Sequence, residues 1–199
     1  ARITPGLSLE AKSGHQLNFS VANLYEGVWD TFQISGGTPI VPGEYWFHEA
    51  IVQFQSSRGG TFRPNVTVSG GSFYDGWRVG TTLTPAWNLS KHLELSIDYT
   101  FNAIRFPDRN ESLDQHLVRF RVRTALDIHL SLSAFAQYNN TESRFTVNAR
   151  LRYHFREGQD LWLVYDEGLN TERAVTSGPQ LPLSDTRALR VKYTHTFIW

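Results

Sequence analysis

The chain has 199 residues, enough for one sizeable domain, and its 19 Lys and Arg residues balance 19 Asp and Glu residues. This balance excludes the basic excess that typifies nucleic-acid-binding proteins. The lack of cysteine excludes disulfides, thiol nucleophiles and thiolate metal sites. Hydrophobic residues make up 40% of the chain and its mean hydropathy is −0.35. No apolar run approaches the roughly 18–20 residues of a membrane helix.

Apolar and polar residues alternate with a period of two along most of the chain, whereas helical periodicity is scarce. In chain order the alternation predicts eleven strands, near residues 7–11, 16–21, 44–56, 62–69, 77–87, 93–102, 118–123, 128–137, 144–155, 161–166 and 187–199. Short turns are expected near residues 13, 58, 89, 127 and 157. Longer loops are expected at residues 28–43, 70–76, 106–114, 139–143 and 169–186. Pro85 predicts a strand end or a bulge, because proline cannot donate a ladder hydrogen bond.

The last strand, residues 187–199 (RALRVKYTHTFIW), alternates most clearly. In a soluble protein, a long terminal strand with one apolar face would offer a hazardous open edge. In a closed barrel within lipid, closure removes the edge and lipid receives the apolar face. Tyr193, Phe197 and Trp199 also resemble the C-terminal aromatic assembly signal of bacterial outer-membrane barrels. They predict recognition by the barrel-assembly machinery.

Two architectures fit the alternation: a transmembrane barrel, or a soluble sandwich or lipocalin-like barrel. Predicted strands of 10–14 residues are long compared with the usual five or six. Their polar face carries Thr, Ser, Asn and Arg rather than the mixed Lys and Glu of a solvated surface. We therefore expect an all-β fold, a transmembrane antiparallel β-barrel in contact with the lipid of the bacterial outer membrane.

Strand parity gives an expectation about the whole protein. If Trp199 ends on the periplasmic side, ten connections place Ala1 outside the cell, yet bacterial single-chain barrels have an even strand number with both ends periplasmic. The first residues also lack the pattern of a signal peptide. We expect residues 1–199 to be a single barrel domain. It would be the C-terminal portion of a longer, even-stranded barrel whose N-terminal part, or partner chain, is missing here.

Five stretches resemble one family, large bacterial outer-membrane proteins with an N-terminal carbohydrate-binding-like module and a C-terminal barrel of unknown function. They are residues 42–47 (PGEYWF), 71–76 (GSFYDG), 137–140 (QYNN), 148–153 (NARLRY) and 156–165 (REGQDLWLVY). The order and spacing of these stretches carry the resemblance, which covers roughly residues 42–199. It implies that a carbohydrate-binding-like module and earlier strands lie upstream. The family offers no catalytic residues to transfer to this chain.

The predicted polar faces are rich in arginine. The residues expected to face the lumen are Arg119, Arg121, Arg123, Arg144, Arg150, Arg152, Arg190, Lys192, Asp98, Asp166 and Trp162. Hairpin register predicts Asp98 near Arg121 or Arg123, and Arg150 near Asp166. One interpretation is an anion-attracting or polar-solute pore wall; the other is a filled lumen in which cations pair with acids, water or a plug. Trp162 and Phe135 would either stack on sugars or pack.

Signals for chemistry are weak. The seven histidines form no two-ligand spacing such as HExxH, and no GxSxG element is present. We therefore predict a non-enzymatic protein without metal, cofactor or nucleic-acid partner. The predicted function is a pore or surface binder for polar solutes such as carbohydrate. The alternatives are a structural barrel that anchors a soluble module or partner at the outer membrane, and an outer-membrane hydrolase.

Overall fold

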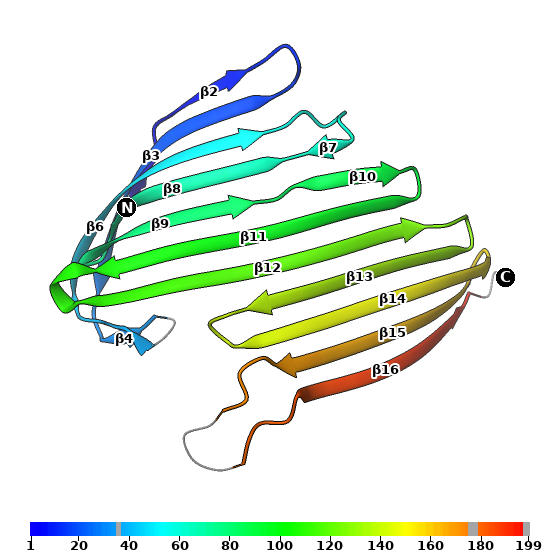
Figure 1. Cartoon of the computed structure of the whole chain (residues 1–199). Coiled ribbons are helices and arrows are strands. Elements are labelled where there is room, and N and C mark those ends of the chain that lie inside the picture. The colour runs from blue at the N-terminus through cyan, green and yellow to red at the C-terminus, as the bar shows by residue number, and fades with distance from the viewer. Residues whose placement is uncertain (35–36, 175–178, 197–199) are drawn as a thin grey trace. The chain divides into compact units, whose positions relative to one another are not determined.

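The computed structural model describes residues 1–34, 37–174 and 179–196 (Figure 1). Antiparallel strands make up most of the described chain, which confirms the predicted all-β antiparallel class. A short 3₁₀ turn, η2 (Pro107–Arg109), connects two of the strands. No helix in the described part has the length and apolarity needed to cross a bilayer. The chain divides into two compact units, residues 1–85 with 98–116 and residues 86–97 with 117–199.

Unit 1 combines long antiparallel strands with several short ones. Its strands are β1 (Arg2–Ile3), β2 (Gly6–Glu10), β3 (Gln16–Val28), β4 (Phe32–Gln33), β5 (Pro39–Ile40), β6 (Gly43–Gln55), β7 (Phe62–Arg63), β8 (Asn65–Phe73) and β9 (Gly76–Leu83), with parts of β11 (Leu93–Phe106) and β12 (Glu111–Ala125). β3 pairs with β1, β2 and β6, and β8 pairs with β6 and β9. β11 continues the sheet next to β9.

Unit 2 is a meander in which sequence neighbours pair. Its strands are β10 (Ala86–Ser90), the start of β11, the later part of β12, β13 (Leu130–Asn139), β14 (Arg144–Arg156), β15 (Gln159–Asn170) and β16 (Ser184–His195). β10 pairs with β11, and β12 to β16 pair in sequence order, all antiparallel. The alternation of the sequence thus becomes two faces of a sheet, because paired residues share a face.

All eleven predicted strands have a counterpart among the described strands. Two breaks coincide with prolines: Pro64 separates β7 from β8, and Pro85 separates β9 from β10, as expected for a residue without a backbone donor. The predicted loop at residues 28–43 contains the small β4–β5 hairpin. β1 was not predicted, since a two-residue strand leaves no alternation to detect.

Two predicted loops are wrong. Residues 70–76 lie mostly in strands, with β8 ending at Phe73 and β9 beginning at Gly76, so only a tight turn connects them. Residues 106–114 likewise contribute to β11 and β12, and the connection is the η2 turn closed by Asn110 in the left-handed region, at φ 51°. The first segment is rich in glycine and the second is polar, and both compositions predict a loop, but the strands extend into these segments.

The fully buried apolar residues of the described chain all belong to unit 1. Ile40, Ile104 and Phe106 form a small core, with Ile40 and Phe106 each only 1% exposed. Val28, Ile34, Tyr45, Phe73, Tyr74 and Leu113 pack around them. The β4–β5 hairpin therefore folds against the sheet of unit 1.

Candidate functional site

One face of each sheet is apolar and exposed, and we call it the apolar face. Its exposed members in unit 1 are Leu7, Leu9, Leu17, Phe19, Trp46, Val52, Phe62, Val68, Trp77 and Val79. In unit 2 they are Trp87, Ile97, Phe120, Leu132, Tyr153, Phe155, Leu163, Leu189, Val191 and Tyr193. Leu189 and Val191 are 66% and 67% exposed. An apolar surface this extensive is rare on soluble monomers and marks a surface that meets lipid or another protein.

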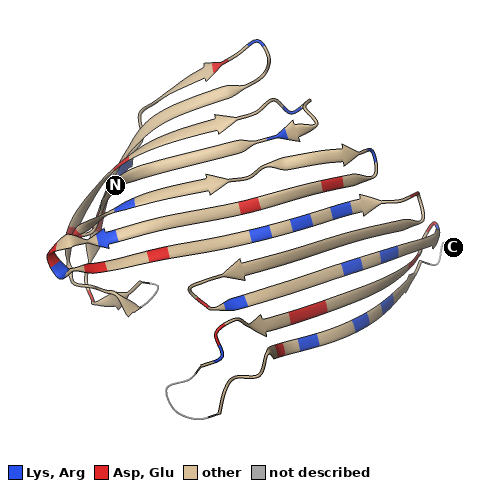
Figure 2. Cartoon of the chain, in the orientation of Figure 1, with Lys and Arg blue, Asp and Glu red and all other residues tan. Residues whose placement is uncertain are grey.

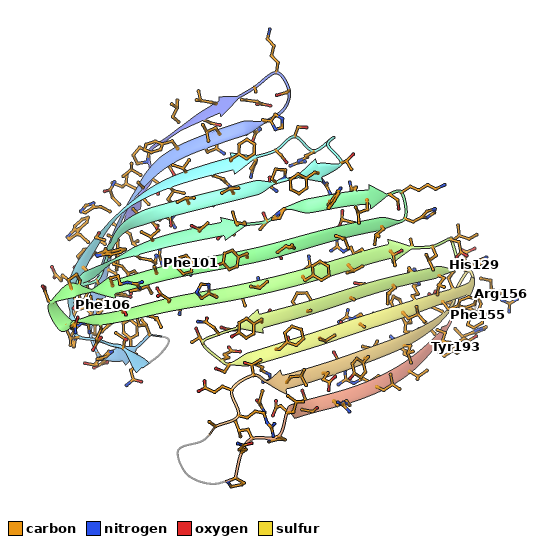
Figure 3. All side chains as sticks on the ribbon, viewed as in Figure 1. Phe101, Phe106, His129, Phe155, Arg156 and Tyr193 are labelled. Carbon is orange, nitrogen blue, oxygen red and sulfur yellow. The ribbon has the colours of Figure 1, made fainter. Side chains whose placement is uncertain are left out.

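Aromatic rings collect near the end of unit 2 that carries the turn at residues 157–158. The ring centroid of Phe155 lies 4.8 Å from that of Tyr153 and 6.4 Å from that of Tyr193. Figure 3 labels Phe155 and Tyr193 close to this turn. Tyrosine and phenylalanine at the rim of an apolar band are typical of the membrane–water interface.

The opposite face of unit 2, which we call the polar face, carries rows of arginines across the strands. Cross-strand pairing gives one row of Arg123, Ser133, Arg150, Val164 and Arg190. The next row holds Ala125, Ser131, Arg152, Trp162 and Lys192. Figure 2 shows the cations as bands along β12, β14 and β16. The predicted alternation of faces therefore holds in these strands.

Acidic partners neutralise part of these rows. Arg123 lies 3.3 Å from Glu94, Arg190 lies 2.7 Å from Asp166, and Arg144 lies 2.7 Å from Asp185. Arg152 donates from Nε and Nη2 to the two oxygens of Asp160, at 2.8 and 3.0 Å. His154 Nδ1 lies 2.9 Å from Asp160 Oδ1. Asp160 lies at the start of β15, next to the turn. It was not predicted as a site residue, because the polar stretch around it predicts only a turn.

The predicted pairing of Arg150 with Asp166 is wrong. Asp166 lies opposite Asn148 and accepts hydrogen bonds from Asn148 and Arg190, whereas Arg150 lies opposite Val164. A register shift between His154 and Arg156 sets this alignment, and the sequence does not reveal it. The expected acidic partner of Arg123 is also different, because Glu94 rather than Asp98 lies beside it. Asp98 belongs to unit 1.

Four predicted lumen cations have no carboxylate partner in the described chain. Arg119 donates to Gln137 at 3.1 Å, while Arg150 and Lys192 make no hydrogen bond or ion pair with the described residues. The guanidinium of Arg121 lies over the ring of Phe135, 5.7 Å from its centroid, and that of Arg152 lies 5.4 Å from the ring of Trp162. These contacts favour packing over sugar stacking for the two aromatics.

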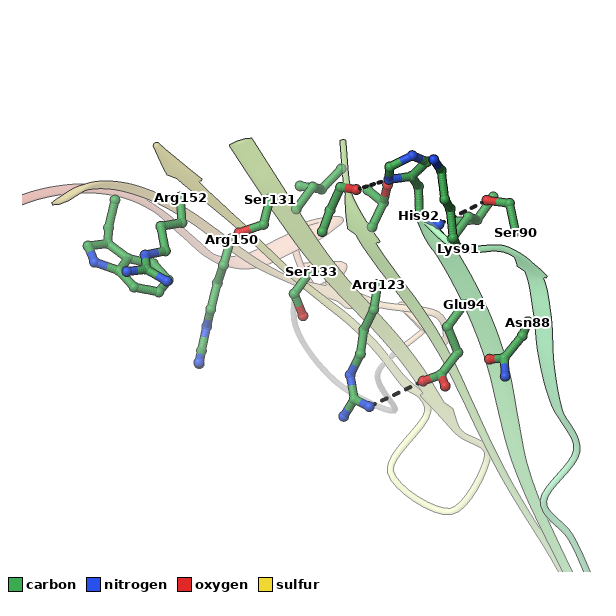
Figure 4. A pocket seen from close by; sticks show the side chains of 15 residues that line it. Asn88, Ser90, Lys91, His92, Glu94, Arg123, Ser131, Ser133, Arg150 and Arg152 are labelled. Carbon is green, nitrogen blue, oxygen red and sulfur yellow. Dashed lines mark hydrogen bonds and ion pairs between the residues drawn. The ribbon is translucent and has the colours of Figure 1, made fainter. Parts of the chain in front are cut away.

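A hollow of about 950 Å³ opens on the polar face of unit 2. Figure 4 shows Arg123, Arg150 and Arg152 projecting into it beside Ser131 and Ser133. At its edge, His92 Nδ1 lies 2.7 Å from the backbone oxygen of Ala125. Its remaining lining residues are Asn88, Ser90, Lys91, Leu93, Glu94, Thr124, Leu132 and Trp162. Four of the lining side chains are cationic and one is acidic.

Unit 1 presents a different polar face. Arg78 pairs with Glu49 at 2.8 Å and lies 5.0 Å from the ring of Phe73. The Arg78 guanidinium donates a hydrogen bond to this carboxylate and so offsets part of the cost of burying its charge. A smaller cavity of about 230 Å³ adjoins this pair and includes Arg2 and Tyr74. The polar face of unit 1 is therefore more filled than that of unit 2.

Arg109 fastens the β4–β5 hairpin, and sequence reasoning missed it. Its Nη1 donates to the backbone oxygen of Pro39 at 2.6 Å, and its Nη2 donates to Asp75 Oδ1 at 3.0 Å. Its guanidinium also lies 4.1 Å from the ring centroid of Phe106. One side chain in the η2 turn thus joins three connections of unit 1. Its position in the polar stretch 106–114 was the only available signal.

The proposed assembly signal is only partly described. Tyr193 lies on the apolar face and is exposed, whereas Phe197 and Trp199 lie outside the described residues. Within the described chain, no group of three His, Asp or Glu side chains is arranged to hold a metal ion.

Comparison with known proteins finds two similar solved structures. The NanC porin, in a rhombohedral crystal form, is 11% identical with a TM-score of 0.40, over 98% of this chain and 93% of that chain. The KdgM porin in complex with disordered oligogalacturonate is 11% identical with a TM-score of 0.37, over 99% and 92%. No family model and no curated protein matches the sequence.

Proposed function

We propose that this protein is an outer-membrane β-barrel that serves as a pore or binding surface for polar solutes such as carbohydrate. The observation that carries this proposal is the opposite chemistry of the two faces. Leu189 and Val191 are exposed on one side of β16, while Arg190 and Lys192 lie on the other. A closed barrel in lipid accommodates both faces, since lipid covers the apolar face and water fills the lumen.

Strand length supports a transmembrane role. A membrane-spanning strand needs about 9–11 residues, and β6, β11, β12, β13, β14, β15 and β16 have between 10 and 15. Near the turn that joins β11 to β12, Arg105 and Asp114 form an ion pair of 2.6 Å. We interpret this pair as lying past the edge of the lipid, where charge is tolerated.

Single-channel conductance tests the pore directly. The purified protein, inserted into planar bilayers, is expected to give discrete conductance steps, and liposomes that contain it should swell in isosmotic solutions of small sugars. Folding in detergent, checked by circular dichroism, is the control. A folded, inserted protein that neither conducts nor permits swelling would refute the pore.

The packed polar face of unit 1 favours a second candidate, a structural barrel that anchors a soluble module. There the β4–β5 hairpin folds onto the sheet and buries Ile40. If such filling extends across the lumen, the barrel is plugged. The resemblance of residues 42–199 to barrels that follow a carbohydrate-binding-like module fits this candidate too. Absence of conductance together with stable membrane insertion would favour it.

A further inference from the structure

Cations outnumber acids on the polar face around the hollow of unit 2. Its two central rows contribute Arg123, Arg150, Arg190, Arg152 and Lys192. The carboxylates within ion-pair distance of these cations are Glu94, Asp166 and Asp160, one for each of three arginines. The charge of Arg150 and Lys192 is left unbalanced by the described residues.

Arg150 differs from the other cations around the hollow because its cross-strand neighbours are uncharged. It faces Ser133 on β13 and Val164 on β15, neither of which carries charge. Arg123 and Arg190 are each two strands away, about 9–10 Å by strand spacing, and both already bind acids. Arg150 therefore keeps all five guanidinium donors for a partner that the described chain does not supply.

The surroundings of Arg150 suit a solute that carries both an anionic group and hydroxyls. Ser131 and Ser133 line the hollow next to it, and each hydroxyl can donate and accept a hydrogen bond. The volume of about 950 Å³ lies within the range of small-molecule sites. A concave wall with an excess of cationic side chains also raises the local concentration of anions.

We infer that the polar face of unit 2 holds a binding site for the oxyanion of a hydroxylated solute, anchored by Arg150. A planar guanidinium matches two oxygens of a carboxylate, phosphate or sulfate. Lys192, whose charge no described carboxylate balances, adds positive potential, and the serine hydroxyls contact the solute's hydroxyl groups. This inference rests on the proposed function, because it requires solute to reach the polar face.

Equilibrium binding to the purified protein in detergent micelles tests the site. The probes are glucuronate, glucose 6-phosphate, inorganic phosphate and neutral glucose, measured by calorimetry at low salt. We expect the sugar anions to bind, glucose to bind at least about tenfold more weakly, and affinity to fall as salt rises. Preference between glucuronate and glucose 6-phosphate identifies the oxyanion, and phosphate alone reports the contribution of the sugar hydroxyls.

Substitutions locate the site. Arg150→Gln is expected to weaken sugar-anion binding at least about tenfold, and Arg150→Lys should be intermediate because it keeps charge but loses the planar fork. The matched control is Arg156→Gln, on the same strand but outside the hollow and exposed at its end. It should leave binding unchanged. Circular dichroism in micelles confirms that each variant is folded.

Three outcomes would overturn the inference: equal binding of glucose and glucuronate, no binding of either sugar anion, or equal loss in the Arg150 and Arg156 variants. The measurement is independent of conductance. Sugar-anion binding without conductance keeps the site and refutes the pore, whereas conductance without anion preference refutes the site alone.

Discussion

Each of the two units has an apolar face, but their polar faces differ. In unit 1, apolar residues and the β4–β5 hairpin fill one end of it, with Ile40 and Phe106 buried. In unit 2, the corresponding face bears arginines and a hollow, and none of its described residues is fully buried and apolar. The alternation that makes a strand amphipathic therefore does not decide whether its polar side becomes a packed or an open surface.

The largest expected effect tests this contrast at Phe106. Phe106→Ala should lower the free energy of unfolding by about 3–5 kcal/mol, because it empties a site that is only 1% exposed. The matched change in unit 2 is Phe135→Ala, whose ring is half-buried beside Arg121. It should cost less than half as much in urea-induced unfolding from micelles. Equal losses of stability in the two variants would contradict a packed polar face in unit 1 and an open one in unit 2.

A charge on the apolar face should have the next largest effect. Val122→Arg is expected to destabilise the barrel in bilayers by about 2–4 kcal/mol, since Val122 lies near mid-strand on the apolar face, which the proposed function places in lipid. The control is Thr146→Arg on the polar face, which should change stability by less than about 1 kcal/mol. Reversible unfolding in lipid vesicles measures both. Unimpaired folding of the Val122 variant would contradict the assignment of faces.

Loss of the Arg109 contacts should have a moderate and local effect. Arg109→Ala removes charged hydrogen bonds to Pro39 and Asp75, and we expect about 1.5–3 kcal/mol less stability. Hydrogen exchange should rise around the β4–β5 hairpin and stay unchanged in β13 and β14. Arg173→Ala, whose Nε donates to the backbone oxygen of Leu181 in unit 2, is the control. If hydrogen exchange around the β4–β5 hairpin is the same in the two variants, Arg109 does not hold the hairpin.

The smallest effect concerns pH and the turn before β13. Asp127 accepts hydrogen bonds from the backbone N–H groups of Leu130 and His129, both at 2.7 Å, which holds the pKa of its carboxyl below the usual value. The stabilisation is thus present above the pKa of the unfolded chain and is lost as pH falls through the folded pKa. Asp127→Ala should reduce the acid sensitivity of unfolding below about pH 4. Glu142→Ala, in another turn of unit 2, is the control.

The sequence was sufficient for the longer strands and their faces, but not for the two-residue strands β1, β4 and β5. The period of two in segments such as residues 93–102 and 144–155 gave both the strand and the side on which each residue lies, because pleating fixes that side. The hairpins at residues 70–76 and 106–114 were misjudged as loops. Glycine in the first segment and polar residues in the second predict a loop, and neither composition indicates that backbone pairing continues into the segment.

The contacts on the polar face were less predictable. Arg150 and Asp166 are both on that face as expected, yet a one-residue register shift near Arg156 sets Asn148 opposite Asp166. The packing of Ile40 and the contacts of Arg109 join segments that are distant in sequence, and one sequence by itself carries no signal for such contacts. Long-range partners are therefore what the sequence leaves open.

The central claim is that the two faces of one strand meet lipid and water. Because the chain has no cysteine, single cysteines at Phe120, Arg121, Leu132 and Ser133 can be reacted with a membrane-impermeant thiol reagent in reconstituted vesicles. We predict reaction at positions 121 and 133 and protection at 120 and 132, with the reverse pattern for a lipid-soluble quencher. Equal reaction at all four positions, or protection at 121 and 133, would contradict a lipid-embedded barrel with a wet polar face.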